Sequence, residues 1–278
     1  MTSEAHPMGN PPTPEAIAAF VADVRDHCGI DYAQYARVSL GRRVHRQMRA
    51  EGFDDITVYR DTVLGDSACL GRLMLALSAH GTSLFRHPGF FRVLREKVVP
   101  LLRTYPSVNV WCAGCSTGEH AYATAIVLQE EGLGAKSRIY ATDAAEVALA
   151  RAREGVYPMD TLRDAEYLDA GGKASMAQYL TVHGGHAALD ASLRNRITFA
   201  QHNLATDASF NEFQLNVCRD VMICFDANLQ ARTFDLMHQS LCRFGILGIG
   251  RGESMRLHPR AGCYETLDAT ERLYRRME

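Results

Sequence analysis

The chain has 278 residues, of which 47% are hydrophobic and 22% charged, and its formal net charge at pH 7 is −2. This composition is ordinary for a soluble globular protein, and the length suffices for one large domain or two modest ones. The nearly balanced charge excludes the strongly basic surface that binds nucleic acid or anionic membranes. Because the apolar runs are too short to span a membrane and no signal peptide is recognisable, we expect a cytoplasmic protein without nucleic-acid or membrane partners.

Eight cysteines raise the question of a disulfide or a metal site. Cys112 and Cys115 form a lone C-x-x-C pair, and no second pair lies at zinc-binding spacing. The other six stand singly, mostly among apolar neighbours, so we interpret them as small buried hydrophobic residues in a reducing compartment. His183 and His186 flank a predicted turn, but two histidines without a third ligand make a weak site. We therefore expect no metal.

The first part of the chain is predicted to be a flexible arm followed by a helical domain. Residues 1–13 contain three prolines and a glycine and are the predicted arm. Residues 14–80 are the predicted helical domain. Its first helix begins after Thr13, a suitable N-cap followed by proline, and ends near residue 28 before Gly29. Apolar periodicity predicts three further helices, over residues 35–49, 56–64 and 68–79.

Residues 81–278 are predicted to form a single α/β domain with a small antiparallel β insertion near residues 178–199. Residues 213–225 are nearly continuously apolar, as buried parallel strands are, although polar residues within that run need a reason. The other predicted elements are helices over 90–102, 119–129, 147–153 and 229–242, strands over 108–112, 137–143 and 244–249, and a closing hairpin of 262–267 with 271–276.

The most informative stretch is residues 108–122. Residues 108–112 predict a short buried strand, residues 113–118 are all small, and a helical pattern begins at Glu119. A strand, a small-residue turn and a helix begin the nucleotide pocket of an open α/β sheet. The next predicted strand ends at Asp143, whose carboxylate either accepts hydrogen bonds from a ribose or caps the following helix. Both roles are compatible.

With these motifs in hand, the chain resembles the CheR family of S-adenosylmethionine-dependent methyltransferases over roughly residues 15–275. The matching stretches are TSLFR at 82–86, WCAGCSTGE at 111–119, ATD at 141–143, GVY at 155–157, HNL at 202–204, CRDVMICFD at 218–226 and GES at 252–254. The resemblance implies a helical N-terminal domain and a class I methyltransferase Rossmann-like sheet with a small antiparallel β insertion. The usual activity of this family is methylation of glutamates on chemotaxis receptors.

The resemblance also implies that S-adenosylmethionine is bound, either as methyl donor or as substrate. Arg86 is suited to pair with the carboxylate of its methionine part, Asp143 to bind its ribose and Asn203 to bind its adenine. The complete set of predicted binding residues is His80, Thr82, Arg86, Ala113, Gly114, Glu119, Asp143, Asn203, Leu204, Arg219 and Asp220.

Four positions depart from what the family usually has. His80 replaces an asparagine, His120 a glutamate, Asp220 an asparagine and Cys224 a tyrosine. In the family that glutamate faces the amino-acid end of the cofactor, and that tyrosine lies near the methyl-transfer centre. The simplest interpretations make His120 a surface residue of its helix, Asp220 a cofactor contact and Cys224 a packing residue. However, the changes gather at the methionine end of the ligand, which indicates an altered use of S-adenosylmethionine.

Our first-ranked hypothesis is cyclisation of S-adenosylmethionine itself to azetidine-2-carboxylate, with release of methylthioadenosine. The α-amine, which titrates at about pH 8 when free, must be neutral to attack the γ-carbon, and the loss of a carboxylate at His120 favours that form. His120 or Asp220 would accept the proton, Tyr157 or Phe85 would hold the sulfonium by cation–π attraction, and Arg86 would hold the carboxylate. This chemistry resembles that of the azetidine-2-carboxylate synthases, which share the scaffold and the substrate.

The alternative hypothesis is methyl transfer to a receptor glutamate or to a small molecule. A receptor protein is a partner only under that alternative. A non-catalytic module that senses the cofactor ranks last.

Overall fold

The computed structural model describes residues 11–78 and 83–278, and it divides into two units, one ending at Leu77 and the other starting at Ser78. The predicted domain boundary after residue 80, and the predicted binding residues His80 and Thr82, lie outside the described residues. Each unit is described by itself below.

The first unit consists of four helices, as the periodicity predicted. They are α1 (Pro14–Cys28), α2 (Arg37–Ala50), α3 (Ile56–Gly65) and α4 (Ser67–Ser78). The Thr13 side chain caps α1 by accepting a hydrogen bond from the backbone N–H of Ala16 at 3.2 Å. Gly29 ends α1 with a φ of 76°, a left-handed conformation that glycine adopts without a steric penalty.

The second unit is built on a seven-stranded sheet with the strand order β6-β2-β1-β7-β8-β10-β9. Strands β6, β2, β1, β7 and β8 are parallel, and β10 pairs antiparallel with both β8 and β9, which confirms the predicted closing hairpin. The bounds are β1 (Val108–Ala113), β2 (Ser137–Asp143), β6 (Ile197–Gln201), β7 (Phe213–Cys218), β8 (Leu241–Ile249), β9 (Tyr264–Asp268) and β10 (Leu273–Arg276).

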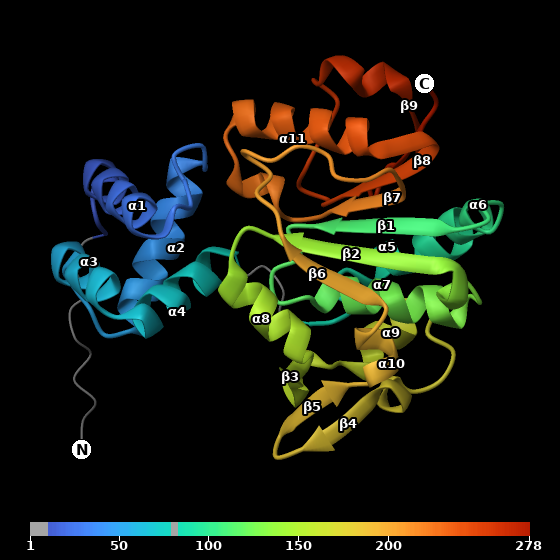
Figure 1. Cartoon of the computed structure of the whole chain (residues 1–278), viewed down its shortest axis with the longest axis horizontal. Coiled ribbons are helices and arrows are strands. Elements are labelled where there is room, and N and C mark those ends of the chain that lie inside the picture. The colour runs from blue at the N-terminus through green and yellow to red at the C-terminus, as the bar shows by residue number, and fades with distance from the viewer. Residues whose placement is uncertain (1–10, 79–82) are drawn as a thin grey trace. The chain divides into compact units, whose positions relative to one another are not determined.

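Helices on both sides cover this sheet. The connections through α7 (Glu119–Glu130) and α8 (Glu146–Glu154) run from β1 to β2 and on to β6, whereas α11 (Ala227–Ser240) connects β7 to β8 in the opposite direction. Since such crossovers are right-handed, α11 covers the other face from α7 and α8. In Figure 1, α11 lies above β7 and β8, and α7 and α8 lie below β1 and β2. The strand order therefore reverses between β1 and β7, where open α/β sheets bind ligands.

The helix predicted over residues 90–102 is interrupted. It consists of α5 (Pro88–Val93), a π-helical turn (Leu94–Val98) and α6 (Val99–Leu102). Pro100 has no N–H to donate to the carbonyl four residues earlier, so regular α-helical bonding cannot continue across it.

The small antiparallel insertion is a separate three-stranded sheet in the order β3-β5-β4. Its strands are β3 (Val156–Pro158), β4 (Leu180–His183) and β5 (His186–Leu189). The predicted range of 178–199 needs correction, because residues 197–201 are β6 and pair in parallel with β2 in the main sheet. An isolated run of β-branched residues does not reveal which sheet it joins. The short helices α9 (Asp164–Asp169) and α10 (Ala191–Arg194) flank the insertion.

The core of the second unit surrounds β1 and β7. Trp111 is fully buried, stacks on Phe213 with ring centroids 5.4 Å apart, and donates from Nε1 to Thr142 Oγ1 at 2.9 Å. Two of the polar residues that needed a reason lie within β7. The Asn216 side-chain amide donates at 3.0 Å to the Met237 carbonyl near the end of α11, and Gln214 Oε1 accepts from the backbone N–H of Asn109 at 2.7 Å. The remaining short elements are 3₁₀ helices at Gly134–Lys136, Met159–Thr161, Met176–Tyr179, Met222–Cys224 and Pro259–Cys263.

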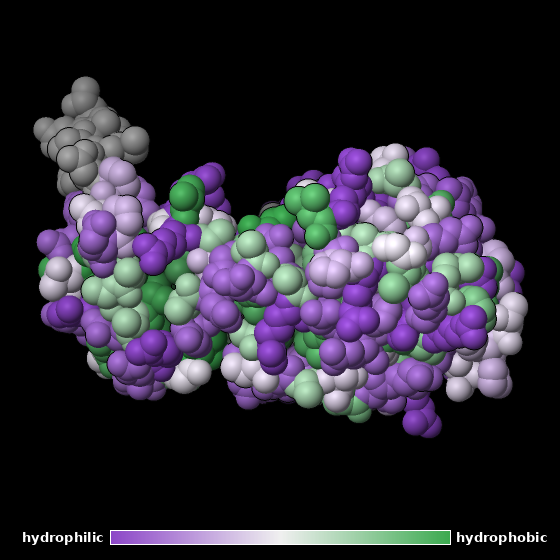
Figure 2. All heavy atoms as spheres, turned by 90° about the horizontal axis from the view of Figure 1, so that it is seen from above, coloured by the Kyte–Doolittle hydropathy of each residue, from purple (hydrophilic) through white to green (hydrophobic). Residues whose placement is uncertain are grey.

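The surface of the described residues is mainly polar. Figure 2 shows one face, on which hydrophilic residues predominate and hydrophobic ones gather only in small groups. None of the helices in residues 11–78 and 83–278 is long and apolar enough to cross a membrane. All eight cysteines are free thiols, six of them buried.

Candidate functional site

The loops that follow β1 and β7 meet at the point where the strand order reverses. Gly114, in the loop after β1, has a φ of 66°, and a Cβ there would lie 2.5 Å from Cγ2 of Val221 in the loop after β7. Glycine is therefore required for packing between the two loops, and not only for the close approach of a ligand that the small residues predicted. This packing brings residues 114–120 and 219–221 together.

A narrow cavity of about 60 Å³ lies between these loops and the segment before α5. It brings together six of the residues predicted from the sequence: Arg86, Gly114, Glu119, His120, Arg219 and Asp220. The remaining lining residues are Ser83, Leu84, His87, Cys115 and Ser116.

Backbone strain is concentrated around the cavity. Among the described residues, five non-glycine residues have a positive φ, and three of them line the cavity: His87 (61°), Ser116 (49°) and Asp220 (60°). Such conformations cost on the order of 1–3 kcal/mol each and are typical of functional sites. All three residues line the same cavity, so the backbone strain that the fold sustains is gathered at one candidate site.

Three buried polar atoms in the lining have no hydrogen-bond partner within the described part of the chain. They are Ser116 Oγ, His120 Nε2 and Arg219 Nη2. An unsatisfied buried polar group costs about 1–3 kcal/mol. A polar ligand in the cavity would remove that cost, so these atoms fit a site that binds one.

The fold fixes one edge of the Arg219 guanidinium. Nη1 donates to the backbone carbonyls of Ile249 at 2.9 Å and Glu271 at 3.0 Å, and the guanidinium lies 4.1 Å above the centre of the Phe90 ring. Burial lowers the pKa of Arg219 to about 10, so it remains a cation at neutral pH. The other edge carries Nη2, which lies 3.9 Å from Glu271 Oε2 but has no hydrogen-bond partner among the described residues, and it is the part suited to a ligand.

The start of α7 contributes a neutral histidine and a glutamate. The His120 ring lies 5.2 Å from the Phe90 ring and 4.8 Å from the Phe91 ring, centre to centre. Burial, followed by the charge of Arg219, lowers the pKa of His120 to about 3. Both carboxylate oxygens of Glu119 accept from Thr117 Oγ1 at 2.7 Å, and burial raises the Glu119 pKa. His120 is therefore not the solvated helix-surface residue of the simplest interpretation, and it is a poor proton acceptor.

Asp220 lies opposite the segment before α5. Its Oδ2 is 3.3 Å from His87 Nε2 and 4.0 Å from Arg86 Nη2. Sequence reasoning missed His87, although it directly follows the TSLFR motif and precedes Pro88, the first residue of α5. Burial lowers the pKa of His87, an effect that the charge of Asp220 opposes.

The predicted ribose and adenine contacts lie elsewhere at the carboxyl ends of the strands. Asp143, at the end of β2, accepts from the backbone N–H groups of Ser116 and Ala145, each at 2.9 Å, and burial raises its pKa. It therefore organises the loop after β1 and the start of α8, and its ribose contact stays a prediction. Ala113 ends β1, and Asn203 and Leu204 follow β6, with the Asn203 side chain accepting from the N–H of Ala205. The adenine contact of Asn203 also stays a prediction.

Two aromatic residues of the cyclisation hypothesis lie outside the cavity lining. The Tyr157 hydroxyl donates to the Thr117 carbonyl at 2.6 Å, and Phe85 packs edge-on against Phe91 and Tyr167. Both residues are buried and neither lines the cavity. Their contact with a sulfonium stays a prediction. Cys224 is also buried.

Comparison with known protein families identifies the family of this chain. Residues 80–271 match the SAM-binding domain of CheR methyltransferase, where SAM is S-adenosylmethionine, and residues 15–78 match its all-alpha domain. The chain belongs to the CheR methyltransferase family. The predicted fold class, a helical domain followed by a class I methyltransferase sheet, is thereby confirmed.

Several members of the CheR family and one larger protein are similar over most of the chain. The candidate methyltransferase Cher3 of Pseudomonas putida is 42% identical over 250 residues, which cover 88% of this chain and 91% of Cher3. A chemotaxis protein methyltransferase of Borreliella burgdorferi is 26% identical over 88% of this chain and 89% of its own length. An uncharacterized 104.1 kDa protein of Rhodobacter capsulatus is 29% identical over 249 residues, and the match covers 26% of that protein.

S-adenosylmethionine is the ligand that the CheR domain binds. That the cavity holds its methionine end, with Arg86 on the carboxylate, stays a prediction. Arg219 Nη2 and Ser116 Oγ are buried donors in the lining without a hydrogen-bond partner among the described residues. Within residues 11–78 and 83–278, no three His, Cys, Asp or Glu side chains lie close enough to hold a metal ion.

Proposed function

We propose that the protein transfers the methyl group of SAM to the side-chain carboxylate of a glutamate in a chemotaxis receptor protein. This is the alternative hypothesis from the sequence, and family membership supports it better than the first-ranked cyclisation. Relatives named as chemotaxis protein methyltransferases match this chain over most of their length, among them proteins of Borreliella burgdorferi and Listeria innocua.

The observation that carries the proposal is that neither histidine in the cavity lining is an effective general base. His87 and His120 are the described lining residues that ordinarily titrate near neutral pH, and both have a lowered pKa. An acceptor amine or hydroxyl would have to lose a proton to such a base during methylation. A glutamate carboxylate is already ionised at neutral pH and needs none.

The reaction then balances without proton transfer. A carboxylate oxygen of the acceptor attacks the methyl carbon, the bond between that carbon and sulfur breaks, and the products are a methyl ester and S-adenosylhomocysteine. The contribution of the chain is to hold the donor by Arg86 and Arg219 and to hold the loops after β1 and β7 together by the packing of Gly114 on Val221.

Cyclisation remains the second candidate, and two observations weaken it. A carboxylate still lies in the cavity, because Asp220 stands near the position vacated by the family's glutamate. Such a carboxylate favours the protonated amine, which cannot attack. In addition, His120 has a pKa of about 3 and is poorly suited to accept the proton that cyclisation releases.

The deciding experiment incubates the purified protein with methyl-labelled SAM, with and without the signalling domains of chemotaxis receptors. We expect label to enter the receptor only and to be released as methanol by mild alkali, as methyl esters are. Arg86→Gln is expected to abolish transfer, and Arg153→Gln, on the solvent side of α8, serves as the matched control. Methylthioadenosine together with azetidine-2-carboxylate, formed from SAM alone, would establish cyclisation. Alkali-stable label in the receptor or in a small molecule would contradict the glutamate acceptor.

A further inference from the structure

Asp220 and His87 form a pair that belongs to the cavity but has no place in the methyl-transfer step itself. Asp220 follows Cys218 and Arg219 at the end of β7, and its side chain is 16% exposed. Its carboxylate lies within ion-pair distance of His87 Nε2 at 3.3 Å and of Arg86 Nη2 at 4.0 Å. Both residues of the pair have left-handed backbones.

The side chain of His87 does not cap helix α5, although its position would allow it. His87 occupies the N-cap position of α5, yet its side chain makes no capping hydrogen bond. With a φ of 61°, it reaches Asp220 instead. Two strained positions far apart in the chain therefore converge on one contact, which indicates that the contact is selected for a purpose other than stability.

The charges in the lining show what the pair can bind. The methionine end of SAM presents a carboxylate and an ammonium group, so its site needs a cation and an anion. Arg86 and Arg219 supply cations. Of the two acidic lining residues, Glu119 shares the single hydroxyl proton of Thr117 between its oxygens, and burial raises its pKa, which disfavours its charged form. His120 is uncharged at neutral pH. Asp220 is therefore the anion that remains for the ammonium group.

We propose that Asp220 binds the α-ammonium group of SAM, and that His87 is a positioning residue that holds the Asp220 carboxylate in place. The proposal rests on the proposed function only in that it concerns the same donor at the same site. It accounts for two departures from the family together: the acidic group lost at His120 is supplied from the loop after β7 by Asp220.

The pair predicts a pH dependence of binding. Neutral His87 carries no charge and leaves the negative charge of Asp220 for the ligand. Protonated His87 would offset that charge, so affinity should fall as the pH drops toward the lowered pKa of His87. The other charged groups that face the pair are Arg86, Arg219, Arg251 and Glu253, and His120 lies close by. The arginines do not titrate in this range, and His120 titrates only near pH 3. Burial raises the pKa of Glu253 and of Glu119, so the comparison with His87→Asn assigns the dependence to His87.

Calorimetric titration of the full-length protein with S-adenosylhomocysteine, and with the analogue that lacks the α-amino group, tests the proposal. We expect Asp220→Asn to weaken binding of S-adenosylhomocysteine by about tenfold or more and to leave binding of the analogue unchanged. His87→Asn should weaken S-adenosylhomocysteine by about threefold and flatten the pH dependence between pH 5 and 7.5. The double variant should bind no worse than Asp220→Asn, because His87 acts through Asp220.

Two further variants keep the test decisive. Asp226→Asn removes a charge in the same loop outside the cavity and keeps a good N-cap for α11, so its affinities should equal those of the wild type. Glu119→Gln tests the competing carboxylate. If Asp220→Asn weakens both ligands equally, or if Glu119→Gln alone shows the selective loss, the proposal is wrong while methyl transfer stands. A wild-type protein that binds neither ligand would overturn both. Thermal melting of each variant checks that it is folded.

Discussion

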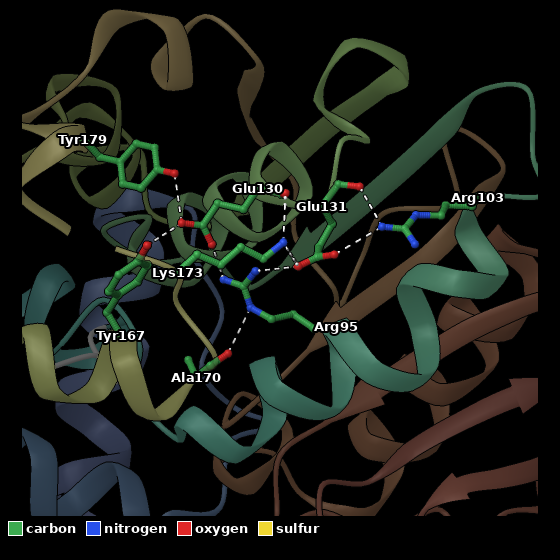
Figure 3. Close-up of polar contacts among 8 residues, drawn as sticks. All are labelled: Arg95, Arg103, Glu130, Glu131, Tyr167, Ala170, Lys173 and Tyr179. Atoms are coloured by element: carbon green, nitrogen blue, oxygen red, sulfur yellow. Dashed lines mark hydrogen bonds and ion pairs between the residues drawn. The ribbon is translucent and has the colours of Figure 1, made fainter. Parts of the chain in front are cut away.

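The two ends of helix α7 differ in whether their buried polar side chains have hydrogen-bond partners. At the carboxyl end, Glu130 accepts hydrogen bonds from Arg95, Tyr167 and Tyr179, and Glu131 pairs with Arg95, Arg103 and Lys173. Every carboxylate oxygen there has a partner, as Figure 3 shows. At the amino end, His120 Nε2 and its neighbours Ser116 Oγ and Arg219 Nη2 are buried without a hydrogen-bond partner among the described residues.

This difference separates the groups that stabilise the fold from the groups that await a ligand. The network around Glu130 and Glu131 ties α7 to the helix containing Arg95 and to the segment that leads into the insertion, residues 164–179. Its members satisfy one another, so it needs nothing from outside. The amino end instead combines strained backbones with unsatisfied donors, a combination that the fold sustains and a ligand would relieve.

Breaking the network at the carboxyl end should have the largest effect on stability. Glu130→Ala removes one of the two carboxylates that pair with Arg95, whose side chain is only 7% exposed, and leaves it with Glu131 alone. Removing one member of a buried ion pair costs about 3–5 kcal/mol, measurable as the free energy of unfolding in urea. The control is Glu146→Ala, which breaks the exposed pair with Arg153 and should cost less than about 1 kcal/mol. Equal losses in the two variants would contradict this assignment.

A change at the amino end should instead affect binding and leave the fold intact. Arg86 is 39% exposed in the cavity. Replacing it by glutamine should weaken S-adenosylhomocysteine by about tenfold or more, while the free energy of unfolding changes by less than about 0.5 kcal/mol. Calorimetry and urea denaturation of the same samples measure the two quantities. A variant that loses stability but keeps its affinity would reverse the comparison between the two ends.

The smallest expected effect concerns the pH dependence of stability at His120. Its folded pKa is about 3, below the ordinary value, so unfolding at acidic pH takes up a proton that the folded state does not hold. Stability is therefore complete above the unfolded pKa and decreases as the pH falls through it, by about 1 kcal/mol between pH 7 and 5.5. His120→Gln should remove that part of the decrease, measured by urea denaturation at the two pH values. His238, which has a lowered pKa of about 4, contributes equally to both proteins.

Short-range features of the sequence determined much of this protein. Thr13 and Gly29 fixed the ends of α1, periodicity placed the helices, and the run from Val108 to Glu119 fixed the strand, turn and helix that begin the site. These features were readable because caps, periodicity and small-residue turns act within a few neighbouring residues. The motifs that identify the CheR family are equally local.

Only the tertiary structure decided which distant residues meet. In the tertiary structure β6 pairs with β2 in the main sheet, and Tyr157 is buried with its hydroxyl on the Thr117 carbonyl. His87 lies next to Asp220, and Glu130 is the centre of a hydrogen-bond network. Each of these depends on burial and on contacts between segments far apart in the chain, to which the sequence around a single residue gives no guide. The same holds for the low pKa of His120: a histidine in a helix sequence becomes a neutral residue only when Phe90, Phe91 and Arg219 surround it.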